Sequence, residues 1–388
     1  MNRFASTPLS WMAGLTLVAA VACGGSATPS GSTSGGGVPS AVTDNLAKFT
    51  AIPVWHAPGP AIDPSKLKGK KIFAIPIAET PFTQAVEAGE QAAANAAGVK
   101  ITFFPNEGSP AAWVQGMQTA ISQHPDLINL DTAPDPRSLQ PQIAAAKAAG
   151  IPVIVTHFYD ANMPDPPACD GCAPGVTAVV KVPFTVVAQA QADWVINASK
   201  GKADVLIVSI SGLLPVPPME QMMLNEYKQY CPDCKVKLVE VSLQQIGQAG
   251  PFSQVSSALV QDPKIDYVNP MFDALIPGSL GAVQAAGKAN KIKMLSFNGS
   301  SFALQDVASG TSPVIADVAE PDTWVGYANM DQAFRLLAGM APVSEVTPFR
   351  IFDQANVSET GGGPNFAGGY GNAYATGFFQ LWGLPAPS

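Results

Sequence analysis

The sequence contains few charged side chains and no concentration of positive charge. Charged residues make up 13% of the 388-residue chain, whereas soluble globular domains usually contain about 25%. Lys and Arg total 21 against 29 Asp and Glu, so the formal net charge is −8. Because no basic cluster is present, this composition argues against binding to nucleic acid and against electrostatic docking on anionic lipid.

Catalytic and phosphate-binding motifs are also missing. The chain has no Gly-x-Ser-x-Gly turn, no His-Glu-x-x-His helix and no Gly-Lys-Ser/Thr sequence. Its histidines are His56, His124 and His157, so a catalytic nucleophile and base would have to be arranged around His157. We therefore expect no enzymatic activity, no cofactor and no metal site. An exported hydrolase that uses His157 is the alternative.

Long apolar runs are confined to the N-terminus. The stretch from Trp11 to Ala22 is mostly apolar, Arg3 precedes it, and small residues lie just before Cys23. This pattern resembles a bacterial lipoprotein signal, in which residues 1–22 are removed and Cys23 is lipidated. An ordinary secretory signal with an accidental cysteine is the alternative. No later segment offers the ~18 uninterrupted apolar residues that a spanning helix needs.

The segment after Cys23 is rich in small polar residues. Residues 24–40 contain 13 Gly, Ser or Thr out of 17 and no charge. Such a composition cannot bury enough apolar surface to become ordered, and as a coil its ends would lie roughly 20–25 Å apart. We expect residues 23–44 to be a flexible tether that holds an extracytoplasmic protein close to the membrane in which Cys23 is anchored.

The remaining four cysteines form two Cys-x-x-Cys pairs, Cys169 with Cys172 and Cys231 with Cys234. Outside the cytoplasm an even number of cysteines favours disulfides, and three connectivities are possible. We favour the two local bridges, because the organisation described below places the pairs in different domains. A zinc site is an alternative, although 58 residues separate the pairs. Redox catalysis is another, although neither pair opens a helix after a strand.

From Gly69 onward, short apolar runs alternate with longer segments of helical periodicity. This alternation is typical of parallel sheets covered by helices on both faces, and it occurs twice. It predicts an α/β protein with two doubly wound parallel-sheet domains, followed by a glycine-rich tail that packs as an irregular extension. The expected strands are 71–77, 99–105, 126–131, 151–156, 203–210, 236–241, 265–268, 292–297 and 314–318. The expected helices are 81–97, 111–123, 138–149, 186–198, 218–230, 252–260, 276–289 and 323–337.

Three short motifs resemble those of a known family. Residues 80–83 (Thr-Pro-Phe-Thr) are similar to its Asn-Pro-Phe-Phe sequence at the first strand–helix junction. Residues 148–154 (Ala-Ala-Gly-Ile-Pro-Val-Ile) resemble its Asn-Ile-Pro-Val strand entry, and residues 296–299 (Ser-Phe-Asn-Gly) resemble its Gly-Phe-Asp-Gly. Together with the order of elements over about residues 69–355, these motifs resemble the type I periplasmic binding proteins, in the branch of the ribose- and galactose-binding proteins of ABC importers.

The resemblance implies two lobes, joined by three chain crossings, that close on a small solute without changing it chemically. A membrane permease would then recognise the closed form. Presentation of the solute to a sensory receptor is the alternative, and we expect the protein to be a monomer. The implied N-terminal lobe comprises residues 45–182 and 321–348, the C-terminal lobe and tail comprise residues 183–320 and 349–388, and the crossings lie near Val182, Glu320 and Phe349.

The resemblance also implies binding residues at the carboxyl ends of the strands. Phe82 lies where the family has a stacking phenylalanine, Asn298 lies where it has an aspartate, and Asp131 or Thr132 lies near a family amide position. Core packing is the alternative role for Phe82. A simple turn is the alternative for Asn298 and the glycine after it.

Other positions depart from the family pattern. His157 and Phe158 replace an Asp-Arg pair, Met223 replaces a second arginine, and Phe272, just before Asp273, replaces an asparagine. The loss of both guanidinium groups disfavours an anionic ligand. We expect a small neutral solute with an apolar face, which means a sugar, a polyol or a less polar or aromatic analogue, or else a cationic solute held by aromatic rings. Packing in the core, or capping of backbone by His157, is the alternative for these positions. The candidate ligand-binding residues are Glu79, Thr80, Phe82, Thr83, Asp131, Thr132, His157, Phe158, Met223, Phe272, Asp273, Asn298, Glu320 and Trp324.

Overall fold

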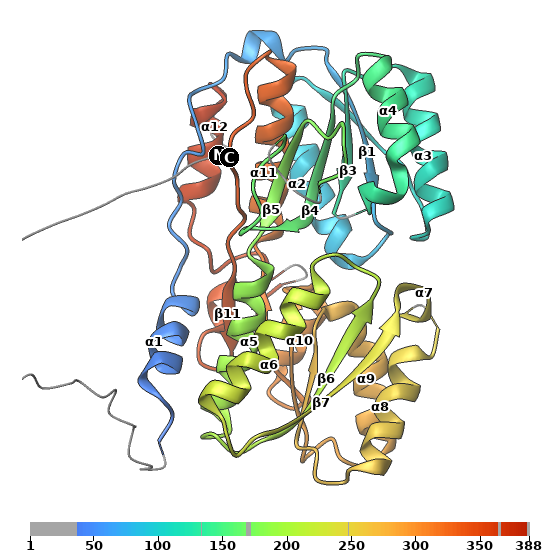
Figure 1. The fold of residues 1–388 in the computed structure, drawn as a ribbon. Helices are drawn as coiled ribbons and strands as arrows, with labels where there is room; N and C mark the ends of the chain where they lie inside the picture. Colours follow the sequence, from blue (N-terminus) through green and yellow to red (C-terminus); the bar gives the residue numbers. More distant parts are fainter. Residues whose placement is uncertain (1–36, 133, 168–171, 247, 364–365, 386–388) are drawn as a thin grey trace, which may run out of the picture. The chain divides into compact units, whose positions relative to one another are not determined.

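Two mostly parallel sheets organise the part of the chain that the structure describes (Figure 1). The structure is a computed structural model, and it describes residues 37–132, 134–167, 172–246, 248–363 and 366–385. The expected signal segment, the lipidation site Cys23 and the first part of the tether lie outside the described residues, as does Cys169. The prediction of two α/β domains is confirmed.

The first sheet has five parallel strands in the order β2-β1-β3-β4-β5. Alternate residues of its strands pack into different clusters on its two faces, so the strands are short continuous apolar runs. Figure 1 shows α3 and α4 on one face and α2 and α11 on the other. We call this sheet and these helices the N-terminal lobe. Its elements are β1 (Lys71–Pro76), α2 (Pro81–Ala97), β2 (Lys100–Phe103), α3 (Pro110–Gln123), β3 (Leu127–Asp131), α4 (Gln140–Ala148), β4 (Val153–Asp160), β5 (Ala178–Val182) and α11 (Asp322–Leu337), with 3₁₀ turns at Pro64–Lys66 and Pro136–Leu139.

The second sheet has six strands in the order β11-β10-β9-β8-β6-β7. Five are parallel, whereas the edge strand β11 is antiparallel to β10, which the sequence does not predict. We call this sheet and its helices the C-terminal lobe. Its elements are α5 (Phe184–Ala198), β6 (Asp204–Ser211), α6 (Val216–Tyr230), β7 (Lys235–Ser242), α7 (Leu243–Ile246), α8 (Gly250–Gln261), β8 (Tyr267–Pro270), α9 (Ile276–Ala285), β9 (Lys293–Asn298), α10 (Ser301–Ser309), β10 (Val314–Ala319) and β11 (Arg350–Asp353), with 3₁₀ turns at Asp273–Leu275 and Val357–Thr360.

Local sequence fixes the start and end of helix α2, which carries several candidate residues. The backbone N–H of Thr83 donates to Thr80 Oγ1 at 3.1 Å, and the N–H of Thr80 donates to Thr83 Oγ1 at 2.8 Å. This reciprocal cap, together with Pro81 in the first turn, satisfies backbone donors that the helix leaves free. Gly98 ends the helix in the left-handed conformation, with φ of 67°. Phe82 therefore lies in the first turn of a helix whose N-terminus is fixed.

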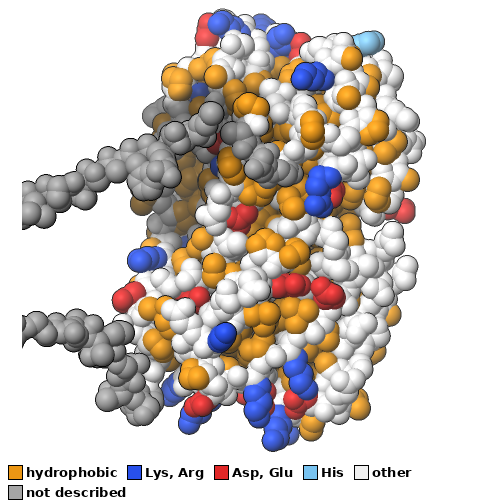
Figure 2. Space-filling view, viewed as in Figure 1, with side chains coloured by type: hydrophobic (Ala, Val, Ile, Leu, Met, Phe, Trp, Pro, Cys, Tyr) orange, Lys and Arg blue, Asp and Glu red, His pale blue; other side chains and the backbone are white. Residues whose placement is uncertain are grey.

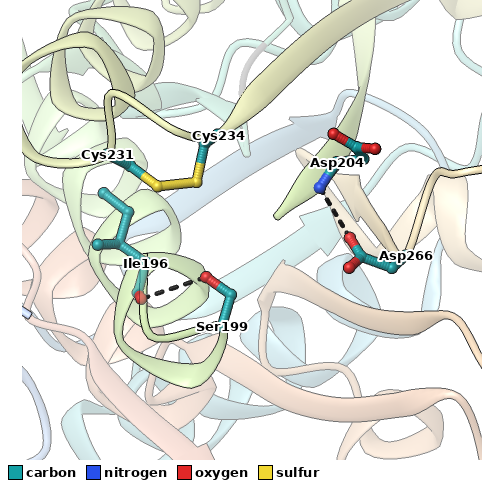
Figure 3. Close-up of a disulfide and its surroundings, with 6 residues drawn as sticks. All are labelled: Ile196, Ser199, Asp204, Cys231, Cys234 and Asp266. Carbon is teal, nitrogen blue, oxygen red and sulfur yellow. Dashed lines mark hydrogen bonds between the residues drawn. A yellow bond between two sulfur atoms is a disulfide. The ribbon is translucent and has the colours of Figure 1, made fainter. Parts of the chain in front are cut away.

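One predicted disulfide is present between Cys231 and Cys234, where α6 ends and β7 begins (Figure 3). The backbone N–H of Cys234 also donates to the carbonyl of Cys231 at 2.9 Å. Close by, the backbone N–H of Asp204 donates to Asp266 Oδ1 at 2.8 Å, which joins the start of β6 to the residue before β8. The bridge expected between Cys169 and Cys172 involves a residue outside the described part of the chain.

The N-terminal boundary differs from the expectation of a tether through residue 44. Helix α1 (Ser40–Phe49) packs against α5 of the C-terminal lobe, with Val42 and Leu46 buried one helical turn apart. Asn45 Nδ2 donates to Asp193 Oδ2 on α5 at 3.0 Å. The end of the expected tether is therefore helical, and residues 45–49 pack on the C-terminal lobe although we assigned them to the N-terminal lobe.

The C-terminal tail also differs from its expected position. Helix α12 (Ala373–Leu381) packs against α11 of the N-terminal lobe, whereas the sequence assigns the whole tail to the C-terminal lobe. Trp382 is fully buried there, between Tyr327 and Phe334 of α11, and its Nε1 donates to Asp331 Oδ1 at 2.8 Å. A large aromatic surface on α11 thus provides the docking site that orders this part of the tail.

Two chain segments near the termini run from one lobe to the other, in addition to the expected crossings. The segment from α1 to β1 and the segment from β11 to α12 lie beside each other along this path. Arg350 Nε donates to the carbonyl of Thr50 at 2.8 Å, Arg335 NH1 donates to that of Pro60 at 2.9 Å, and the N–H of Ile62 donates to the carbonyl of Leu381 at 2.8 Å. These bonds hold the two terminal segments to the lobes and to each other.

Truncation of the tail anchor should strongly destabilise the protein. We expect Trp382→Ala to lower the free energy of unfolding by about 3–5 kcal/mol, because it removes a buried ring and leaves a cavity. Denaturant unfolding followed by circular dichroism measures this loss. The control is Val260→Ala, at a position that is 83% exposed, where the change should stay within about 0.5 kcal/mol. Equal unfolding midpoints for the two variants would contradict the docking of α12 on α11.

The carboxyl group of Asp193, which accepts a hydrogen bond from Asn45 of α1, should make the free energy of unfolding depend on pH. Burial, and then the nearby charge of Glu226, raise the pKa of Asp193 from 3.8 to about 8. The folded protein therefore binds this proton more tightly than the unfolded chain, so stability must fall as pH rises from about 4 to about 8. Denaturant unfolding across this range should show a smaller fall for Asp193→Asn, whereas Asp233→Asn, at an exposed position, should behave like the wild type. An unchanged slope in Asp193→Asn would refute this assignment.

Candidate functional site

A cavity of about 550 Å³ lies between the carboxyl ends of strands from the two lobes. Residues that follow β1, β2 and β3, together with His157 on β4, line one side, and residues at or after the ends of β6, β7, β8 and β9 line the other. Ligands of open α/β sheets bind outside the carboxyl ends of the strands, so this is the place where a binding site is expected. Among the candidate residues, the cavity is lined by Glu79, Thr80, Phe82, Thr83, Thr132, His157, Phe272 and Asn298.

His157 occupies the centre of the polar part of the cavity. Its Nε2 lies 2.7 Å from Oε2 of Glu320, which follows β10 at the passage to α11. Asn298 Nδ2 donates to the same carboxylate oxygen at 3.3 Å. The rings of Phe82 and Phe184 lie 5.0 Å and 5.4 Å from the imidazole, centroid to centroid. One carboxylate and two aromatic rings therefore hold the imidazole in place, and Glu320 supports the site from behind.

Three residues that line the cavity have backbone angles that are unusual for residues other than glycine. The φ angles of Thr132, His157 and Asn298 are 48°, 56° and 141°. His157 lies where the pairing of β4 with β5 shifts register, between Thr156 and Asp160. Such angles cost of order 1–3 kcal/mol each and are concentrated at functional sites. The surrounding structure thus holds these three side chains in place against local strain.

Asp131 does not line the cavity but lies fully buried beneath it. Its Oδ1 accepts hydrogen bonds from Thr156 Oγ1 and from Asn329 Nδ2, both at 3.1 Å. Burial raises the pKa of Asp131 to about 6. Burial and the charge of Asp131 raise the pKa of Glu90, which accepts from the same amide of Asn329 at 2.8 Å, well above its ordinary value. Asp131 therefore positions the neighbouring Thr132 instead of facing the cavity.

Asp273 likewise supports the cavity from behind. Its Oδ2 accepts from the backbone N–H of Ser300 at 2.7 Å, and Asp317 Oδ1 accepts from the N–H of Gly299 at 2.9 Å. Burial raises the pKa of both carboxyl groups, and the charge of Asp273 adds to the effect on Asp317. A side chain at Gly299 would meet Ala319 Cβ at 2.7 Å, so this turn requires glycine. The two carboxyl groups and the glycine fix the turn that presents Asn298.

Phe158 and Met223 lie in the hydrophobic core and not at the cavity. Successive residues of a strand point to opposite faces, and Phe158 turns away from the cavity into the core, where its ring lies 5.1 Å from that of Tyr159. Met223 is fully buried on α6 against the second sheet. Both are core residues, which was the alternative role for these positions, and they are not candidates for ligand binding.

Trp324 also does not line the cavity. It lies in the first turn of α11 and stacks on Tyr374 of α12, with ring centroids 4.8 Å apart and planes 9° apart. The stacking of Trp324 on Tyr374 was not expected, because the sequence had led us to assign the tail to the other lobe. Trp324 therefore belongs to the aromatic surface that docks the tail, and we remove it from the candidate set as well.

Much of the cavity wall consists of apolar residues that sequence analysis did not select. Some follow strand ends, as Ile77 does, and the others lie near the end of β6, in the 3₁₀ turn at Asp273–Leu275, or in α2, α5, α7, α9 and α10. Their positions after predicted strands are a signal, but apolar residues at such positions are also common in cores. The additional apolar residues are Ile77, Ala78, Pro81, Phe184, Ile210, Leu213, Pro215, Leu243, Ile246, Ala274, Pro277 and Phe302.

Negative charge predominates around the cavity. Among the described residues that line it, the acidic ones are Glu79 and Glu107, and none is Lys or Arg. On the face drawn in Figure 2, Lys and Arg side chains are interspersed with acidic and apolar ones instead of forming one continuous surface. Within the described residues, no group of three His, Cys, Asp or Glu side chains is placed to hold a metal ion. In the same part of the chain, every helix is too short or too polar to cross a membrane.

Comparison with solved structures identifies proteins with the same fold. A solute-binding protein of an ABC transporter from Agrobacterium vitis, bound with α-D-tagatopyranose, has a TM-score of 0.66 and 22% identity, and the match covers 76% of this chain and 97% of that one. A 5-methylthioribose transporter solute-binding protein from Thermotoga lettingae, in complex with 5-methylthioribose, has a TM-score of 0.65 and 20% identity, with coverage of 78% and 91%. A sugar ABC transporter protein from Yersinia enterocolitica has a TM-score of 0.66 and 23% identity, with coverage of 84% and 98%.

Sequence comparison gives the family directly. No curated protein sequence matches the chain. The family model for the periplasmic binding protein domain matches residues 72–341, which spans most of both lobes. The chain therefore belongs to the periplasmic binding protein family, and its fold is the type I fold of the solute-binding proteins of ABC sugar transporters.

Proposed function

We propose that this protein captures a small neutral solute in the cavity between its lobes and delivers it to the permease of an ABC importer. The solute class is a sugar, a polyol or a less polar analogue. The observation that carries the proposal is the cavity itself, which lies at facing strand ends and is lined by polar side chains from both lobes. A solute that contacts both lobes stabilises the closed arrangement by its differential affinity for it.

The lobes would rotate about the chain passages that connect them. In the proposed assignment these passages lie near Val182, Glu320 and Phe349. Glu320 is notable among them, because it contacts both His157 on β4 and Asn298 on β9. Glu320 thus lies at a passage and also contacts candidate binding residues of both lobes. Binding of a solute in the cavity would therefore affect the relative orientation of the lobes through this residue.

The candidate contacts divide by chemistry. Phe82 and Phe272, both 9% exposed, present ring faces to the apolar surface of a solute. Thr132, His157 and Asn298 offer hydroxyl, imidazole and amide groups that can satisfy polar groups of the solute. None of these residues forms a nucleophile–base pair, and the proposed role of the protein is binding without catalysis.

A binding screen tests the proposal. We expect the melting temperature to rise with at least one compound among neutral sugars, polyols and their alkyl or aryl derivatives. Loss of a buried hydrogen bond costs about 1–3 kcal/mol, so Asn298→Ala should weaken that binding by about tenfold or more in calorimetry. Asn290→Ala, at an exposed position, is the matched control and should bind like the wild type. If no compound stabilises the protein and native mass spectrometry of the purified chain finds no bound molecule, the proposed function is refuted.

The proposed attachment to the membrane depends on Cys23, which lies outside the described residues. We expect the full-length protein, expressed in a bacterium that processes lipoproteins, to sediment with membranes and to carry a mass increase from acylation at Cys23. Cys23→Ser should shift the protein to the soluble extracytoplasmic fraction, whereas Ser26→Ala should leave it with the membranes. Soluble wild-type protein without acyl groups would instead indicate an ordinary secretory signal.

A further inference from the structure

Most side chains that line the cavity are apolar, and the polar ones differ in how they are placed. Thr132, His157, Asn298 and Ser300 lie on β4, at the end of β9, or just after β3 and β9. Thr80 and Thr83 also line the cavity, but they bond each other in the cap of α2, and Glu79 and Glu107 are exposed. The strands β8 and β6 lie between β9 and the edge strand β7 in the second sheet. The polar groups therefore lie toward one side of the sheets, near the passage at Glu320.

The opposite side of the cavity is apolar. Ile210 lies near the end of β6 and Leu213 lies just after it. Leu243 and Ile246 lie on α7, which directly follows β7. None of these side chains carries a hydrogen-bonding group, so a solute surface placed against them must be able to lose its water without needing a polar partner.

This arrangement does not match the chemistry of a free sugar. A monosaccharide carries hydroxyl groups around most of its ring, and each one that is buried without a partner is unfavourable. Here the buried polar groups outside the cap of α2 are few, and they do not lie beside the apolar residues of β6 and α7. A solute that fills the cavity would therefore need hydroxyl or carbonyl groups at one end and an apolar body at the other.

The charges around the cavity limit the solute further. An anionic group would face Glu79 and Glu107 and would find no Lys or Arg among the described lining residues. Oε2 of Glu320, the carboxylate nearest these polar groups, already contacts His157 and accepts from Asn298, so this oxygen is engaged within the protein. A positively charged group placed at Oε2 would have to displace these contacts. A neutral polar end fits without displacing any of them.

We infer that the solute is a neutral ring compound whose apolar ring lies against the residues of β6 and α7, and whose hydroxyl or carbonyl groups lie against Thr132, His157 and Asn298. This inference rests on the proposed function, since it assigns the solute class of the same cavity. An aryl glycoside or a hydroxylated polycyclic compound has this division of polar and apolar surface.

Two matched sets of probes test the inference by calorimetry. The first set compares galactose with phenyl β-D-galactoside, which share a polar end and differ in the apolar ring. We expect the phenyl derivative to bind at least about tenfold more tightly, because its ring becomes buried. The second set compares 2-naphthalenemethanol with 2-naphthoate and 2-naphthylmethylammonium, which share the ring system and differ in charge. We expect the neutral alcohol to bind most tightly.

A pair of variants locates the ring. Leu213→Ser places a hydroxyl in the apolar wall and should lower, several-fold, the ratio of phenyl galactoside affinity to galactose affinity. Val260→Ser, on the exposed face of α8 and 83% exposed, is the control and should change neither. Thermal unfolding of both variants verifies that they are folded.

The outcomes separate the inference from the function on which it rests. Galactose binding as tight as that of its phenyl derivative, or tighter binding of naphthoate or naphthylmethylammonium than of the alcohol, would overturn the inferred solute class and leave solute capture intact. Failure of every probe to bind, with no bound molecule in native mass spectrometry, would overturn both.

Discussion

The contact of His157 with Glu320 is the interaction on which the geometry of the site depends. It joins the distorted end of β4 in one lobe to the residue that leaves β10 in the other, at 2.7 Å. Asn298 donates to the same carboxylate, so binding residues from both lobes converge on one group. A buried charged group that loses its partner is strongly unfavourable. The side-chain positions of His157 and Asn298, two residues with unusual backbone angles, therefore depend on this cluster.

The alternation of strands and helices can be predicted because its signal is local. A strand buried on both faces is a continuous apolar run, and a helix such as α2 carries its own caps in the sequence. Helices α1 and α12 could not be placed in this way, since each is ordered by a surface formed elsewhere in the chain. Val42 and Leu46 of α1 need α5, and the aromatic residues of α12 need α11. Tertiary contacts, and not local propensity, decide these elements.

The same distinction applies to the site. Polar residues directly after the predicted strands, such as His157 and Asn298, stand out in the sequence. A buried polar group at such a position needs a hydrogen-bond partner or a ligand. Which of two adjacent residues faces the cavity depends on the strand pleat and on the register shift in β4, and this decides between His157 and Phe158. The apolar wall gives no such signal, because Leu243 and Ile246 lie on a four-residue helix that sequence periodicity cannot detect. Asp131, Asp273 and Glu320 were expected to contact the ligand, and Asp317 was not selected; their positions behind the lining are visible only in three dimensions.

The terminal segments place a constraint on any movement of the lobes. Helix α1 is docked on the C-terminal lobe and α12 on the N-terminal lobe, so the chain that connects each of them to its neighbouring strand must span both lobes. Arg350, the first residue of β11, donates to the carbonyls of Thr50 and Gly369. It therefore holds both spanning segments together. A rotation that closes the cavity would have to keep these bonds or bend the segments between them. The glycines of residues 361–371, several of which have positive φ, provide backbone that can bend without steric conflict. The closing rotation with the lowest free-energy cost would therefore have an axis that passes close to Arg350. The spanning segments would move least there.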